Sequence, residues 1–330
     1  MVTNRISELD AAKGIGIFLV SLGHIITGQA PLGNQWAITM RELVYTFHMP
    51  FFMFLSGFLM YYSYKKISSV KDYSKYSLKK FLRLFPAFLL FSLLIFFGKY
   101  FSEKFMHVDN PVANLTSYFQ VFITPQISFS GYLWYIYVLF VFYLLFPILL
   151  FVSKQKLWVW LPVSLFCSVC VYFIVITKNF TLNLVFEHFF VFTLGAVCSK
   201  YYNNFFSIIK KYALLFIFIF SVILFFRAYY PIPKLVTGII SIPAIFGLIT
   251  FPFIKKITHL DLWGKYTFII YLLNTLVIGL LKGIIFKFTT WDFSNFFIVA
   301  PILLFGGLYI PIFIKKKILI HIPYLDKITN

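Results

Sequence analysis

About ten apolar stretches, each long enough to cross a bilayer as a helix, follow one another along this chain. Spanning helices need about 20 mostly apolar residues, because backbone polar groups inside a membrane must bond to each other. Of the 330 residues, 61% are hydrophobic and 12% are charged, which is more apolar material than one water-soluble core can bury. The sequence therefore predicts an all-α, polytopic transmembrane helical bundle of about ten helices. The predicted spans are 13–30, 43–63, 84–101, 130–152, 157–177, 183–200, 211–227, 235–253, 265–287 and 293–314.

The positive charge of the chain, +19 at pH 7, follows the loops. If the N-terminus lies inside, the basic segment 64–83 and the tail lysines 315–317 also fall inside, whereas Glu103, Asp109 and Asp292 fall outside. Short cytoplasmic loops carry an excess of Lys and Arg, so this distribution predicts cytoplasmic N- and C-termini. We interpret the charge as a topology signal for a multi-pass protein, and we expect no nucleic-acid partner.

No Pro/Gly/Ser-rich linker or fixed-period repeat divides the chain. We expect one integral membrane domain over 1–330 without an appended soluble domain. In the ninth predicted span, Gly279 and Gly283 form a G-x-x-x-G pattern, which favours close helix packing within the bundle and leaves a homodimer as a further possibility. Membrane lipid is the one partner that the composition requires.

Three cysteines, Cys167, Cys170 and Cys198, lie in or at the ends of apolar spans. Metal and redox sites need thiolates in polar or electropositive surroundings, which these cysteines lack. We interpret them as packing residues and expect no metal.

Polar groups at membrane depth are expensive, so each is a candidate for function. Lys13 and His24 in the first span are eleven residues apart, which places them on one helix face with about 16 Å of rise between them. An imidazole titrates near neutral pH and can accept a proton from an attacking hydroxyl. His24 is thus the first candidate for a base, and a buried histidine bonded to a neighbouring helix is the alternative.

The second span carries Glu42 and His48 in its outer half, followed by Pro50. Both side chains are candidates to orient a sugar hydroxyl or a catalytic base. The alternatives are a carboxylate favoured by the dipole at a helix N-terminus and an interfacial histidine.

Two further groups of residues are candidate binding sites. Lys80 and Arg83, three residues apart on one face before the third span, can hold phosphates. Trp134 and Tyr135 open the fourth span and can form an aromatic wall for a sugar or an interfacial anchor.

Several of these motifs closely resemble the acyltransferase-3 family, in its fucose O-acetylase-like branch. The family's basic residue, ten others and His correspond to Lys13 and His24 within the run 8–24. Its FHMP-F-F-x-x-SGF pattern corresponds to 47–58, and its basic-x-x-Arg pattern to Lys80 and Arg83. Weaker similarity continues through 133–135, 192–195 and 270–274, where this chain has Asn274 at a position at which family members often have His.

The resemblance implies transfer of an acyl group, usually acetyl from acetyl-CoA, to a hydroxyl of a cell-surface or lipid-linked carbohydrate such as capsule or exopolysaccharide. It assigns Lys13, Lys80 and Arg83 to the CoA phosphates and His24 to proton abstraction from the sugar hydroxyl. Together with the absence of a recognisable eukaryotic sorting signal, it implies a bacterial plasma membrane.

A transporter or flippase of lipid-linked sugars is the alternative function, because it too needs a polar path through a helical bundle. Secondary transporters commonly show internal repeats and paired broken helices, which this sequence lacks. A structural subunit would leave Lys13 and His24 unexplained.

Overall fold

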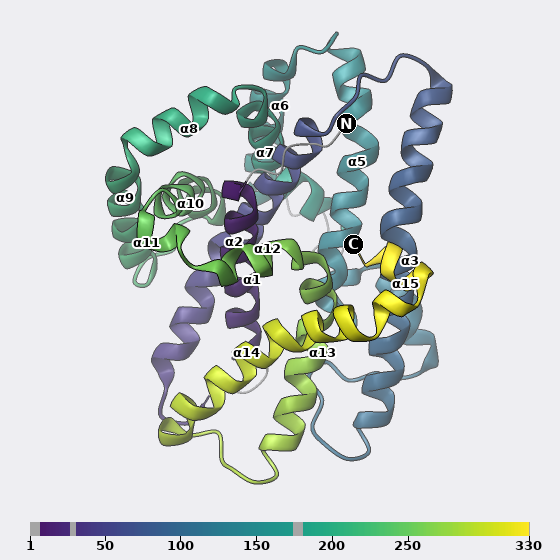
Figure 1. Cartoon of the computed structure of the whole chain (residues 1–330), viewed down its shortest axis with the longest axis vertical. Coiled ribbons are helices and arrows are strands. Elements are labelled where there is room, and N and C mark those ends of the chain that lie inside the picture. Colours follow the sequence, from purple (N-terminus) through teal and green to yellow (C-terminus); the bar gives the residue numbers. More distant parts are fainter. Residues whose placement is uncertain (1–6, 27–30, 174–180, 330) are drawn as a thin grey trace. The chain divides into compact units, whose positions relative to one another are not determined.

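The computed structural model describes residues 7–26, 31–173 and 181–329. These residues form helices joined by short turns, and none of them belongs to a β-strand beyond one isolated bridge between Leu32 and Asp292 (Figure 1). The all-helical prediction is therefore confirmed for the described chain.

Among the described residues, six helices are long and apolar enough to cross a membrane, and each overlaps a predicted span. They are α2 (Gln35–Tyr62), α3 (Val70–Ser102), α5 (Trp134–Val152), α7 (Leu182–Lys200), α13 (Thr267–Ile285) and α14 (Phe293–Lys317). The chain is thus a multi-pass membrane protein. The cytoplasmic placement of both termini stays a prediction.

The other four predicted spans are helical but are not confirmed as membrane-crossing. Helix α1 (Ser7–Ile25) carries Glu8, Asp10 and Lys13 in its first two turns. The described parts of the remaining three helices have 14 to 16 residues and rise about 21–24 Å, whereas the apolar core of a bilayer is about 30 Å thick. They are α6 (Trp160–Phe173), α9 (Ala213–Arg227), which is bent by 75° from α8 (Tyr202–Lys211), and α10 (Lys234–Ile249). The predicted ends at 27–30 and 174–177 lie outside the described residues.

The chain separates into two compact units, and the division falls inside α2, between Leu55 and Ser56. Unit 1 comprises residues 1–55 and 201–322, and unit 2 comprises 56–200 and 323–329. The prediction of a single domain over 1–330 is not tested by this division and stays a prediction.

Unit 1 is built around α1, which packs against α10, α12 (Thr258–Lys265), α13 and α14. The contact between α1 and α12 is made by backbone. A Cβ on Gly14 would lie 2.1 Å from the Leu260 carbonyl oxygen, and one on Gly264 would lie 1.9 Å from the Asp10 carbonyl oxygen. Only glycine permits this approach. A Cβ on Gly279, by contrast, would meet nothing within 4 Å, so close packing at that glycine within the bundle is not observed.

The last long helix of unit 1, α14, has a well-formed N-terminus. The Asp292 carboxylate accepts hydrogen bonds from the Asn295 backbone N–H and from the Ser294 and Thr290 hydroxyls, and these bonds lower its pKa to about 2. This cap satisfies an N–H group that has no partner within the helix. The short helices α11 (Pro252–Lys255) and η5 (Leu319–His321) complete the unit.

In unit 2, α3 packs against α5 and against the C-terminal helix α15 (Pro323–Ile328), and α6 packs against α7. Ser168 on α6 links to α7, because its hydroxyl donates to the Phe186 carbonyl and accepts the Phe190 N–H. Short helices connect α3 to α5 and α5 to α6: η1 (Leu115–Phe119), α4 (Gln120–Ile123), η2 (Pro125–Ile127), η3 (Gly131–Leu133) and η4 (Leu157–Val159).

Candidate active site

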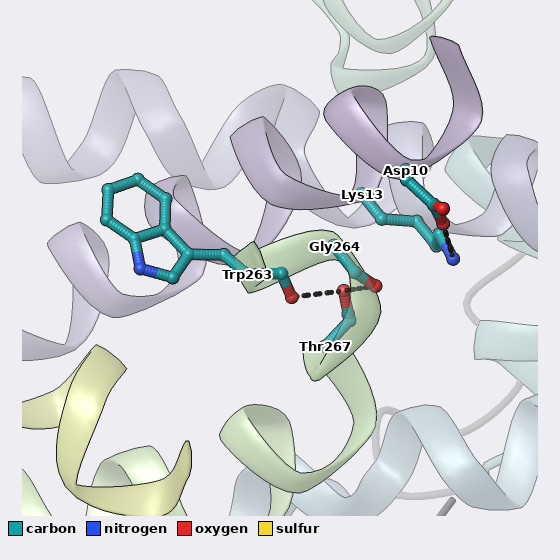
Figure 2. A network of polar contacts seen from close by, with 5 residues as sticks. All are labelled: Asp10, Lys13, Trp263, Gly264 and Thr267. Carbon is teal, nitrogen blue, oxygen red and sulfur yellow. Dashed lines mark hydrogen bonds and ion pairs between the residues drawn. The ribbon is translucent and has the colours of Figure 1, made fainter. Parts of the chain in front are cut away.

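Lys13 and His24 belong to one uninterrupted helix, α1, so the shared face and the rise of about 16 Å predicted from their spacing hold. Lys13 forms an ion pair of 2.6 Å with Asp10, one turn earlier, and Figure 2 shows the two side chains turned toward each other. Asp10 is buried at 6% exposure, whereas Lys13 is half-buried. The Lys13 charge is therefore already balanced by a carboxylate within the chain.

The corner between α12 and α13 holds this end of α1 (Figure 2). At the corner, the Thr267 hydroxyl lies 3.0 Å from the Trp263 carbonyl oxygen and 2.9 Å from that of Gly264. The Trp263 ring stacks on Phe18 of α1 at 5.8 Å. Backbone contact at Gly264 and ring contact at Phe18 together fix the height and rotation of α1.

His48 on α2 is buried, and its ring orientation is set by its own helix. The Nδ1 atom lies 2.8 Å from the Val44 carbonyl oxygen, one turn earlier. A carbonyl oxygen can only accept, so Nδ1 carries a proton, and in the neutral ring Nε2 is then the basic nitrogen. The Tyr45 ring lies beside the imidazole, with 5.0 Å between centroids.

Pro50 interrupts the backbone hydrogen bonding of α2. Proline has no N–H, so the Thr46 carbonyl loses its usual partner within the helix. The Thr237 hydroxyl on α10 lies 3.2 Å from that carbonyl oxygen and 3.1 Å from the Lys234 carbonyl oxygen on its own helix, and it can donate its one proton to either. The next residue, Gly238, makes room for the proline, because a Cβ there would lie 2.5 Å from the Pro50 Cβ. The pair Thr237–Gly238 thus packs against α2 at its proline, two residues from His48.

His24 faces α2 and α13. A Cβ on the neighbouring Gly23 would lie 2.3 Å from the Tyr45 ring, which shows how closely α1 and α2 approach here. His48 and Lys282 both act electrostatically on His24. Sequence reasoning missed Lys282, although a lysine inside the ninth predicted span is itself the signal that could have found it.

Asn274 on α13 contacts α1 about one turn before His24. It is buried on α13, and its amide donates to the hydroxyl of Ser21 on α1 at 3.4 Å. Asn274 therefore joins α1 to α13 at the position where the resemblance often places a histidine.

Glu42 is not brought into this group. Its side chain is 67% exposed and lies 3.9 Å from the Arg41 guanidinium. Glu42 and His48 are six positions apart, which puts them about 120° apart around α2. The Arg41 guanidinium also donates to the Ile26 carbonyl at 3.2 Å, just beyond the end of α1.

In unit 2, Lys80 is held by aromatic rings. Its ammonium lies 5.4 Å from the ring centroid of Tyr76, on the same helix, and 4.2 Å from that of Tyr143 on α5. Among the described residues, no carboxylate lies within ion-pairing distance of Lys80. Arg83 is exposed one turn further along α3 and acts electrostatically on Tyr143.

Residues Ser56 and Gly57 of α2 lie near the second pair of aromatic candidates, Trp134 and Tyr135. The Ser56 and Tyr135 hydroxyls are hydrogen-bonded at 2.6 Å, and a Cβ on Gly57 would lie 1.9 Å from the Phe192 carbonyl oxygen on α7. Trp134 packs against His188 with 5.2 Å between ring centroids. Trp134 and Tyr135 therefore lie where α2, α5 and α7 meet within unit 2.

No group of three or more His, Cys, Asp or Glu side chains suited to a metal ion occurs in the part of the chain that the structure describes.

The fold and these polar groups define a multi-pass helical membrane protein with histidines and cations inside its helical units. The sequence profile of the acyltransferase-3 family, described as an acyltransferase domain, matches residues 6–316. The chain belongs to this family and is therefore a membrane acyltransferase. No curated relative and no solved structure matches the chain significantly.

Proposed function

We propose that this protein is an O-acetyltransferase of the bacterial plasma membrane, of the fucose O-acetylase-like branch. It moves acetyl from cytoplasmic acetyl-CoA to a hydroxyl of a cell-surface or lipid-linked carbohydrate. The observation that carries the proposal is the match of the acyltransferase family over residues 6–316, and the close approach of α1 and α2 at Gly23 and Tyr45, near His24 and His48, supports it. The motifs at 8–24 and 47–58 support the branch.

In the proposed reaction, His24 removes the proton of the acceptor hydroxyl as its oxygen attacks the thioester carbonyl. The new C–O bond forms, the C–S bond breaks, and the proton passes to the departing CoA thiolate. His48 takes part in the same proton transfer through Nε2, because its Nδ1 is bonded to the Val44 carbonyl oxygen. Lys282, which acts electrostatically on His24, supplies positive charge for the oxyanion that develops on the carbonyl oxygen.

Lys80 and Arg83 hold the phosphates of CoA, because a phosphate oxygen accepts hydrogen bonds from ammonium and guanidinium groups. Lys13 contributes less to this attraction, since Asp10 already balances its charge. Trp134 and Tyr135 offer ring faces for a sugar. We assign Glu42 no part in the chemistry, given its exposure.

The test is incorporation of labelled acetyl from acetyl-CoA into surface polysaccharide by membranes that contain the protein, compared with membranes that lack it. Label that depends on the protein supports the proposal. If no label appears while export of the polysaccharide depends on the protein, the flippase replaces the acetyltransferase.

A further inference from the structure

Two tyrosines one turn apart on α3 have different environments. The Tyr73 hydroxyl donates to the Leu144 carbonyl on α5 at 3.1 Å. The Tyr76 hydroxyl is buried, and no hydrogen-bond partner for it exists among the described residues. A buried hydroxyl without a partner costs free energy, so such a group calls for an explanation.

The Tyr76 ring also contacts Lys80, whose ammonium lies between the Tyr76 and Tyr143 rings. Contact with two ring faces restricts a long, flexible side chain to one region and leaves its N–H groups able to donate. The unpartnered hydroxyl and the ammonium thus belong to one small cluster, Tyr76, Lys80 and Tyr143, that contains donors and positive charge.

This cluster suits an anionic acceptor. A phosphate oxygen carries negative charge and only accepts hydrogen bonds, so it matches a hydroxyl donor beside an ammonium. A sugar hydroxyl both donates and accepts, and it makes no use of the charge. Arg83, one turn along α3 from Lys80, adds positive charge on the same helix.

We propose that the Tyr76 hydroxyl donates a hydrogen bond to a phosphate oxygen of the acyl donor, next to the Lys80 ammonium that Tyr76 and Tyr143 hold in place. This inference rests on the proposed function for the identity of the donor, CoA. It adds Tyr76 and Tyr143 to the residues that bind it. Anionic lipid headgroups present the same phosphate chemistry, and the experiment separates the two sources.

The experiment measures binding of CoA to the full-length protein in nanodiscs of zwitterionic lipid, for wild type and Tyr76→Phe. The substitution removes one oxygen atom and keeps the ring over Lys80. We expect the Kd for CoA to rise about 10-fold, as for a lost hydrogen bond to a charged group. The melting temperature without ligand stays equal or rises, because the hydroxyl that is removed had no partner.

Tyr73→Phe is the matched control, one turn away on the same helix. It removes a hydroxyl that bonds to Leu144, so it lowers the melting temperature and leaves the Kd for CoA unchanged. A lower melting temperature for Tyr76→Phe with unchanged CoA affinity would show a structural hydroxyl and overturn the inference.

Two further outcomes are separable. If wild type does not bind CoA, the proposed function fails, and the inference fails with it. If Tyr76→Phe binds CoA as wild type does but loses stabilisation by added phosphatidylglycerol, the phosphate belongs to a lipid and the assignment to the acyl donor is overturned.

Discussion

The histidines of unit 1, His24 and His48, and the cluster of Tyr76, Lys80 and Tyr143 in unit 2 are organised by different interactions. His48 is oriented by a backbone carbonyl, and the Thr237 hydroxyl lies within hydrogen-bonding distance of the Thr46 carbonyl that Pro50 leaves without a partner in the helix. Lys80, by contrast, is held by the faces of two rings, and the nearby Tyr76 hydroxyl has no partner among the described residues. The first arrangement fixes ring nitrogens, which proton transfer requires. The second provides donors for a ligand.

The comparison predicts that substitutions in the two clusters change different kinetic constants. The largest effect is expected for His48→Ala, which removes a group assigned to proton chemistry. We expect kcat to fall about 10²- to 10³-fold with little change in the KM for acetyl-CoA. Steady-state kinetics at matched protein abundance measure this, and an unchanged kcat would remove His48 from the chemistry.

Lys80→Ala is expected to change the KM for acetyl-CoA. Loss of the ammonium raises the KM for acetyl-CoA about 10- to 100-fold and leaves kcat nearly unchanged, because the phosphates do not react. Raising the salt concentration should weaken the binding of acetyl-CoA to wild type more than its binding to the variant. Lys79→Ala, on an exposed neighbouring lysine, is the control. Equal effects of the two substitutions would reduce Lys80 to a general basic charge.

A smaller effect is expected for a substitution at Thr237, which affects the reaction only by positioning α2 and its His48. Thr237→Val keeps the shape but loses the donor to the Thr46 carbonyl, so we expect kcat to fall about 5- to 10-fold, while Thr237→Ser stays near wild type. A double-mutant cycle with His48→Ala tests whether Thr237 acts by positioning His48. If the Thr237→Val defect keeps its full size without His48, the threonine does not act by positioning that histidine.

Stability is the readout for Lys13. Lys13→Ala removes the ion-pair partner of the buried Asp10 carboxylate, and we expect the free energy of unfolding to fall by about 1–3 kcal/mol. The double variant Lys13→Ala with Asp10→Asn should recover most of it. Thermal unfolding in detergent measures both. A rise in the KM for acetyl-CoA that persists in the double variant would instead give Lys13 a direct part in donor binding.

The sequence allowed prediction of features that depend on local periodicity. The shared face of Lys13 and His24 followed from helix geometry, and six of the predicted spans proved long and apolar enough to cross a membrane. The ion pair between Asp10 and Lys13 was also predictable in principle, since residues three apart meet on a helix.

Contacts between distant segments could not be predicted in this way. Thr237 meets Thr46 across 191 residues of chain. The missing N–H of Pro50 shows that a donor is needed but does not show which helix provides it. The exposure of Glu42 depends on the rotation of α2, which close packing at Gly23 and Gly238 determines. The Lys80–Tyr143 contact likewise requires the pairing of α3 with α5.

The most direct test of the central claim is acetyl transfer from labelled acetyl-CoA by His24→Ala and by His107→Ala, a substitution at an exposed loop histidine. The account predicts that His24→Ala loses transfer at least about 10²-fold while still binding CoA, and that His107→Ala retains it. Full transfer by a correctly folded His24→Ala protein would contradict the assignment of the base and the mechanism built on it.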